Sequence, residues 1–190
     1  MKNFIIIIFI ISFSSTLVAQ GFEAQLIGGT SFSQIDGDNL AGYNNIGITI
    51  GGATNFLLKN GYSFQQEIVY YQRGSRANDV QLFDDNFTYK NLDYIDFNLL
   101  FNKQLKEKWE IQLGTGAGKV LRVKSDDPND KLVYYAIDVF GVLGGGYYFT
   151  ENLLINVRLQ YSVKSAQKNI RWFHNNSMAF TVRWKFMRKD

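Results

Sequence analysis

The chain has 190 residues and no cysteine, one proline, 16% aromatic residues and a formal net charge of +3. The lack of cysteine excludes a disulfide framework and a lipid-modified cysteine, and so small a charge excess does not indicate nucleic acid as a partner. Beyond residue 20, no stretch approaches the roughly 18 to 20 consecutive apolar residues that a membrane-spanning helix needs.

The first twenty residues, MKNFIIIIFIISFSSTLVAQ, differ from the rest of the chain. A single positive charge at Lys2 precedes a short apolar run, and small residues lead up to Ala19 and Gln20. This pattern is typical of a secretory signal peptide, because the apolar run is too short to span a bilayer. We therefore expect residues 1–20 to direct Sec-type export and to be removed near Ala19/Gln20. Residues 21–190 are then expected to form one domain.

After the signal segment, apolar and polar residues alternate in about eight segments. In chain order these predicted strands are residues 22–33, 46–56, 62–73, 93–101, 109–119, 137–149, 153–164 and 177–186. The first is irregular, with Gly28 and Gly29 at its middle. Gln66 interrupts the apolar face of the third, and we interpret it as a residue near a membrane edge.

The last segment, SMAFTVRWKF, shows what the alternation separates. Strand side chains point alternately to opposite faces of a sheet. One face therefore carries Met178, Phe180, Val182, Trp184 and Phe186, and the other carries Ser177, Ala179, Thr181, Arg183 and Lys185. The first face suits hydrocarbon, whereas the second suits water or polar partners.

The connections between segments alternate in length. Short ones occur at LLKNGY, KQLKEKW and FTENL, and longer polar ones cover residues 34–45, 74–91, 124–135 and 167–176. Short turns at one end and long loops at the other are typical of outer-membrane barrels. The sequence thus predicts an all-β fold, a closed antiparallel eight-stranded up-and-down transmembrane β-barrel. An even number of strands returns both chain ends to the short-turn side.

If the apolar face meets lipid, the polar face must line the barrel interior. With about eight strands the interior is only wide enough for side chains to fill it, and buried charges there need partners. The inward set contains the acids Glu67, Asp96 and Glu110 and the bases Arg158, Arg183 and Lys185. Small inward residues leave room for them, namely Gly51, Ala53, Gly114, Gly116 and Ala179. We interpret the six charges as a structural lumen network, with an ion gate or a proton relay as alternatives.

Aromatic residues lie near the ends of several predicted strands. Tyr62, Trp109, Tyr147 and Phe149 fit a girdle at a membrane interface. Trp184 and Phe186 occupy similar positions near the end of the chain.

Two stretches resemble a known family. GGTSFSQIDGDNLAGYNNIGITIGG (residues 28–52) and LDYIDFNLLF (residues 92–101) are similar to small outer-membrane barrels of Bacteroidetes, grouped as PorT-like or "outer membrane protein beta-barrel domain" proteins. The resemblance implies a barrel in the bacterial outer membrane, in contact with outer-membrane lipid and inserted by the barrel-assembly machinery. By the same analogy, Phe180, Trp184 and Phe186 would form the C-terminal insertion signal.

The sequence contains no recognisable catalytic constellation. His174 is the single histidine and falls in the last predicted outer loop. The acidic stretches at residues 36–39 and 125–130 lack EF-hand spacing, so we interpret them as polar loops. GTGAG (residues 114–118) lies within an alternating strand and lacks the phosphate-loop ending, which favours barrel curvature. We therefore expect a protein that is not an enzyme and has no cofactor or metal.

The leading functional hypothesis is an integral outer-membrane barrel with a side-chain-filled lumen. Its role would be structural, accessory or surface interaction, through outer loops that contact an unknown surface or periplasmic protein. The long predicted loop 74–91, with Phe83, Phe87 and Tyr89, is the candidate contact surface. The main alternative is a small porin-like ion or solute channel. A membrane-embedded enzyme and a soluble secreted barrel with inverted faces are two further alternatives.

Overall fold

A computed structural model describes residues 21–38, 40, 42–77, 89–126, 137–165 and 173–189 of the chain. The predicted signal segment, both loop phenylalanines (Phe83 and Phe87) and most of the acidic stretch 125–130 lie outside the described residues. No helix in the described part of the chain is long and apolar enough to cross a membrane.

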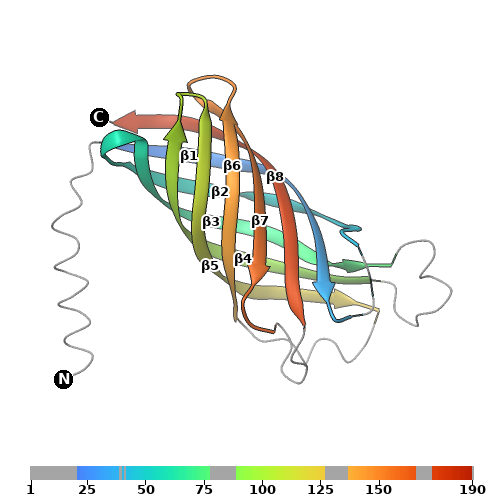
Figure 1. Cartoon of the computed structure of the whole chain (residues 1–190). Helices are drawn as coiled ribbons and strands as arrows, with labels where there is room; N and C mark the ends of the chain where they lie inside the picture. The colour runs from blue at the N-terminus through green and yellow to red at the C-terminus, as the bar shows by residue number, and fades with distance from the viewer. Residues whose placement is uncertain are drawn as a thin grey trace, which may run out of the picture.

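The strands form one closed antiparallel barrel in which each strand pairs with its neighbours in the chain and the last pairs with the first (Figure 1). The strands are β1 (Gly21–Asp36), β2 (Asn45–Leu57), β3 (Tyr62–Arg76), β4 (Tyr89–Leu105), β5 (Trp109–Ser125), β6 (Ile137–Tyr148), β7 (Leu153–Ser162) and β8 (His174–Lys189). A single 3-10 turn, η1 (Lys59–Gly61), joins β2 to β3. This architecture confirms the fold that the alternation predicted.

The three short connections, β2–β3, β4–β5 and β6–β7, lie at one end of the barrel, where β1 begins and β8 ends (Figure 1). The predicted long connections lie at the other end. The connections after β1 and after β3 are shorter than predicted, because strand pairing continues beyond the clearly alternating residues. Gly74 pairs with Asn91 and Arg76 with Tyr89, so the predicted loop 74–91 narrows to residues 77–88.

Two further boundaries differ from the prediction. His174 opens β8 and pairs with Asp36 of β1, so its assignment to a loop was wrong. The seventh predicted strand, residues 153–164, also ends too late: β7 ends at Ser162 and Lys164 is exposed. The first error falls where polar residues follow one another and give no periodic signal, and the second falls where the alternation continues two residues beyond the end of β7. Backbone pairing with a neighbouring strand decides where each strand ends.

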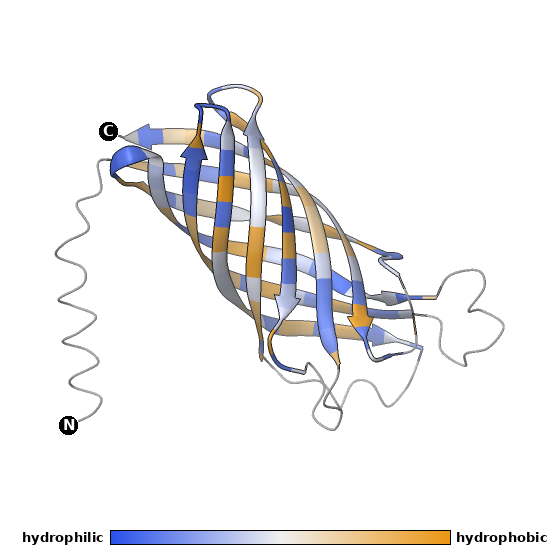
Figure 2. Cartoon of the chain, in the orientation of Figure 1, coloured by the Kyte–Doolittle hydropathy of each residue, from blue (hydrophilic) through white to orange (hydrophobic). Residues whose placement is uncertain are grey.

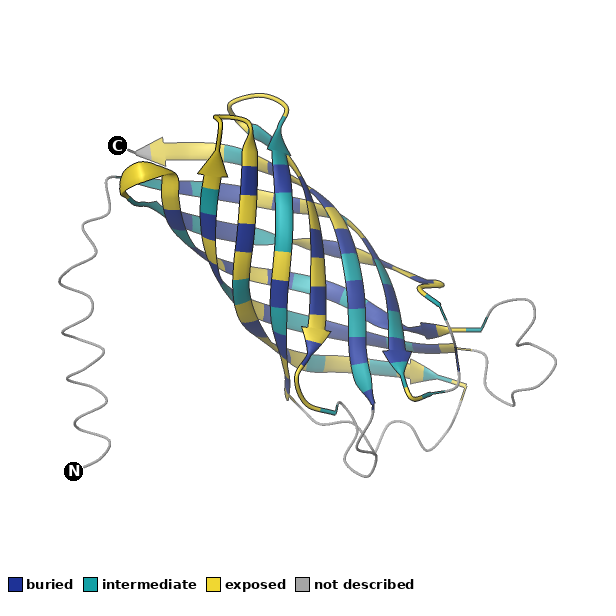
Figure 3. Ribbon diagram, in the orientation of Figure 1, coloured by how far each residue is buried: buried dark blue, intermediate teal, exposed yellow. Residues whose placement is uncertain are grey.

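Hydropathy changes from residue to residue along most strands (Figure 2), and burial alternates in the same way (Figure 3). Large apolar side chains point outward, with Ile46 67%, Leu113 63% and Ile68 60% exposed. Polar and charged side chains are buried inside, including Glu67 and Arg183 at 1% each. Gln66 is exposed on the outward face, as the alternation required. The assignment of the large apolar residues to the outside is therefore confirmed. The interior is mainly polar, with a buried apolar cluster that includes Ile35, Leu92 and Phe173.

Candidate functional site

The centre of the lumen holds one carboxylate between two arginines. Arg158 of β7 donates to both oxygens of Glu67, with Nη1 2.7 Å from Oε2 and Nη2 3.0 Å from Oε1. Arg183 of β8 places Nη2 3.0 Å from Glu67 Oε1. All three side chains are nearly inaccessible. One negative charge thus faces two positive charges, and the excess must be balanced by dipoles.

Neutral oxygens supply that balance. Gln112 Oε1 accepts from Nη2 of Arg158 and from Nη2 of Arg183, each at 3.2 Å. Gln65 Oε1 accepts from Nη1 of Arg183 at 3.2 Å. Hydrogen bonds to charged groups are stronger than those between neutral groups, and more so where the groups are buried. The central layer is therefore a connected network in which each guanidinium has several acceptors.

A second layer lies toward the long-loop end, around Arg73 of β3. Its guanidinium forms an ion pair with Asp96 and lies 3.5 Å from Asp138 Oδ2. The rings of Tyr71, Tyr94 and Phe140 surround it, with centroids 4.6, 4.8 and 4.5 Å from Cζ. Aromatic faces stabilise a desolvated cation electrostatically. This layer therefore packs one arginine, two carboxylates and three rings together, all of them buried.

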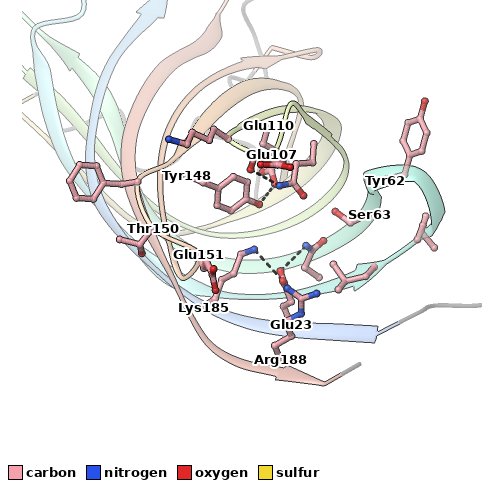
Figure 4. A pocket seen from close by; sticks show the side chains of 17 residues that line it. Glu23, Tyr62, Ser63, Glu107, Glu110, Tyr148, Thr150, Glu151, Lys185 and Arg188 are labelled. Carbon is pink, nitrogen blue, oxygen red and sulfur yellow. Dashed lines mark hydrogen bonds and ion pairs between the residues drawn. The ribbon is translucent and has the colours of Figure 1, made fainter.

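A third group lines the mouth at the short-turn end (Figure 4). Lys185 Nζ lies 3.1 Å from Glu23 Oε1 and 4.4 Å from the ring centroid of Tyr148. The hydroxyl of Tyr148 donates to Glu110 Oε2 at 2.7 Å, and Gln112 Nε2 donates to Glu110 Oε1 at 2.7 Å. A cavity of about 740 Å³ opens here and extends inward to Glu23, Glu110 and Lys185.

The six charged residues predicted for the lumen all lie on its inward face. The structure brings Glu67, Arg158 and Arg183 together in the central layer. The other three have partners outside the predicted set: Asp96 contacts Arg73, Glu110 contacts Tyr148 and Gln112, and Lys185 contacts Glu23.

Three members of the network were missed by the sequence reasoning. Arg73 and Asp138 occupy inward positions of the third and sixth predicted segments, so the alternation itself points them into the lumen, although the predicted set of six charges left them out. Glu23 lies in the irregular first segment, where the alternation gave no reliable signal. Its partner Lys185 lies at a β-bulge, where Ala24 pairs with Met187 while Gln25 pairs with Lys185.

The glycines of β5 make room for this interior. A Cβ atom at Gly118 would overlap Asp96 Oδ1, and one at Gly116 would overlap Asn98 Oδ1 and the ring of Phe140. The GTGAG stretch thus lies in the strand, as predicted, and its inward glycines accommodate large neighbours.

The predicted interfacial aromatics gather at the short-turn end of the outer wall. Trp109 is 57% and Phe149 69% exposed. Trp109 contacts Tyr147 with ring centroids 4.9 Å apart, and Tyr62 stacks on Phe101 at 5.3 Å. Their role at an interface remains a prediction, as does that of Phe180, Trp184 and Phe186 in insertion; these three side chains are exposed on the outer face of β8.

The described residues contain no group of three or more histidine, cysteine or acidic side chains placed to hold a metal ion. The ring of His174 stacks on Tyr161, with centroids 5.7 Å apart, and its Nδ1 lies 3.0 Å from the carbonyl oxygen of Ser162. These contacts give the histidine a structural role in the wall.

A closed eight-stranded antiparallel barrel with an apolar outer surface and an ion-paired, filled interior defines the class of small outer-membrane β-barrel proteins. The chain belongs to the family "Outer membrane protein beta-barrel domain", whose model matches residues 15–167. It is therefore a protein of the bacterial outer membrane. In this class the short turns are periplasmic and the longer loops are extracellular.

Solved structures share this fold at low sequence identity. Neisserial surface protein A is 11% identical, covering 87% of this chain and 97% of that chain with a TM-score of 0.55. Ail, the attachment invasion locus protein of Yersinia pestis, solved in complex with the heparin analogue sucrose octasulfate, is also 11% identical. The match covers 87% of this chain and 99% of that chain with a TM-score of 0.51. No curated protein matches the chain.

Proposed function

We propose that the protein is a non-enzymatic outer-membrane barrel that acts through its extracellular loops, as a structural, accessory or surface-interaction component. In this proposal residues 1–20 direct export and are removed near Ala19/Gln20. The barrel-assembly machinery then inserts the barrel, using Phe180, Trp184 and Phe186 as its signal. The resemblance of residues 28–52 and 92–101 to PorT-like barrels supports a place among the Bacteroidetes members of the family.

The filled lumen is the observation that carries this proposal. Arg73, Arg158 and Arg183 are each buried and ion-paired to side chains from other strands. Opening a path would separate these charges in a narrow interior, where an unpaired charge is costly. If the lumen does not conduct, the extracellular loops and the outer wall are the parts of the barrel that can bind other molecules.

Replacement of residues 77–88 by a short Gly-Ser linker tests the loop proposal. We expect cells that carry the wild-type barrel to bind at least one member of an array of glycans and surface proteins. Heparin belongs in the array because Ail was solved with a heparin analogue. The replacement should abolish binding while the folded barrel still migrates differently before and after boiling, since β3 and β4 remain paired below the loop.

The matched control replaces the short turn 149–152, at the opposite end of the barrel, by the same type of linker. It should leave binding unchanged. A wild-type barrel that binds nothing in the array, or binding that survives loss of residues 77–88, would contradict the proposal.

A small channel is the second candidate, and the cavity at the short-turn mouth favours it. That cavity of about 740 Å³ already leads inward to Glu110 and Lys185. We expect planar-bilayer recordings of the wild-type protein to show no conductance steps, because the layers around Glu67 and Arg73 close the lumen. Wild-type steps that change in Glu67→Gln or Arg158→Ala would instead establish the channel.

A further inference from the structure

The outer face of β5 carries basic residues only at its extracellular end. From Trp109 to Ala117 its outward side chains are uncharged, with Ile111 49% and Leu113 63% exposed. Beyond them Lys119, Arg122 and Lys124 are exposed. The uncharged part and the basic part both belong to strand β5 itself, and so to the wall of the barrel.

The spacing along β5 places this change at the edge of the hydrocarbon. A strand rises about 3.3 Å per residue, and tilted by about 40° it climbs about 25 Å between Trp109 and Lys119. The apolar band of an outer-membrane barrel is also about 25 Å tall. Because Trp109 belongs to the aromatic group at the periplasmic end, Lys119 lies where the outer leaflet changes from acyl chains to headgroups. Because Leu121 is an extra residue in a β-bulge and adds little length, Arg122 and Lys124 lie only about 5 and 10 Å further out.

A β-bulge in β5 lies next to Arg122, the middle one of the three basic residues. Asp93 pairs with Arg122 while the next residue, Tyr94, pairs with Val120, so Leu121 is the extra residue and is 55% exposed. Arg122 Nε donates to Asp93 Oδ2 at 2.6 Å. Gln72 Nε2 donates to the other oxygen, Oδ1, at 3.2 Å and to the hydroxyl of Tyr70 at 3.1 Å. These contacts hold the Arg122 guanidinium in one orientation.

The charges of this part of the wall do not cancel. Asp93 neutralises Arg122, and Asp126 lies beyond Lys124, where it accepts from the backbone N–H of Tyr89. Lys119 and Lys124 form no ion pair with any residue that the structure describes, and Arg76 at the end of β3 is a further exposed base. Counted over the described residues alone, four bases face two acids here, an excess of about two positive charges on a surface that points sideways, in the plane of the membrane.

We propose that Lys119, Arg122 and Lys124 bind the phosphate groups of a phosphorylated glycolipid in the outer leaflet. Its acyl chains would lie along the apolar outer face of β5 below Lys119, and its phosphates would contact the two lysines on either side of the oriented Arg122. A lipid suits the site because β5 offers cations and apolar area together on one lateral face. Basic residues beside a membrane surface attract anionic lipid at about 1 kcal/mol each.

Lipid A is the probe for this site, with and without its phosphates. The variant Lys119→Gln/Lys124→Gln removes the two lysines and leaves the Arg122–Asp93 ion pair intact. We expect native mass spectrometry of the detergent-solubilised barrel to show roughly 30-fold weaker binding of phosphorylated lipid A to this variant, from about 1 kcal/mol for each lysine. Dephosphorylated lipid A should bind wild type and variant equally weakly.

The matched control, Lys59→Gln/Lys106→Gln, removes the same charge from exposed positions at the periplasmic turns. It should bind phosphorylated lipid A as the wild type does. Equal binding by Lys119→Gln/Lys124→Gln and the control would overturn the proposal, and so would equal binding of phosphorylated and dephosphorylated lipid by the wild type. The wild type and both double variants should each migrate differently on a gel before and after boiling, which verifies that each barrel is folded.

Discussion

Glu67→Gln is expected to destabilise the folded barrel by about 3–5 kcal/mol, the usual cost of removing one partner from a buried ion pair. The substitution leaves Arg158 and Arg183 without a carboxylate in a layer where both are almost fully buried. Urea unfolding in lipid vesicles, followed by tryptophan fluorescence, measures the change in the free energy of unfolding.

Glu107→Gln is the matched control for Glu67→Gln, because Glu107 is an exposed acid in the turn between β4 and β5. It should change the free energy of unfolding by less than about 0.5 kcal/mol. Addition of Arg183→Met to Glu67→Gln should restore part of the loss, because it removes one of the two unpaired cations. A loss below about 1 kcal/mol for Glu67→Gln would show that the central layer is not held by this carboxylate.

Leu113→Arg is expected to cost about 2–4 kcal/mol, the range for a base on the lipid face near the bilayer midplane. Leu113 is 63% exposed and points outward from the middle of the apolar part of β5. The same unfolding experiment in vesicles measures the loss.

Leu105→Arg is the depth-matched comparison, because Leu105 is also exposed but ends β4 at the periplasmic turn. Near an interface the same change should cost only about 0–1 kcal/mol. Comparing the two substitutions also distinguishes a membrane barrel from a soluble barrel. Around a soluble barrel Leu113→Arg would face water and be harmless, so equal, small effects of both substitutions would contradict a lipid-facing outer wall.

The central layer shows how far the residue pattern leads toward the site. Glu67, Arg158 and Arg183 were predicted to point inward because each lies on the polar side of an alternating strand, although Gln66 interrupts the apolar side next to Glu67. That Arg158 and Arg183 share one carboxylate was not predictable, since Arg158 and Glu67 lie 91 positions apart in the chain. Their meeting depends on how the strands are staggered around the closed wall.

In the second layer, too, the sequence pattern predicted the direction of a side chain but not its contacts. Arg73 lies on the inward face of its predicted segment, but its enclosure by Tyr71, Tyr94 and Phe140 involves three strands. Glu23 was missed because the first segment alternates poorly and because a bulge shifts the register beside Lys185. Bulges depend on the local fit between two strands, and neither strand reveals them alone.

The order of residues was enough to decide which face of each regularly alternating strand meets lipid and which meets the lumen. It also predicted the closed barrel and the end that carries the short turns; the irregular first segment was the exception. This worked because a period of two is a local property and lipid and lumen select opposite residue types. The partners inside the lumen, the true ends of the loops and the charge excess on β5 were settled only when the wall closed. Closure sets the register between strands, and register decides which distant side chains meet.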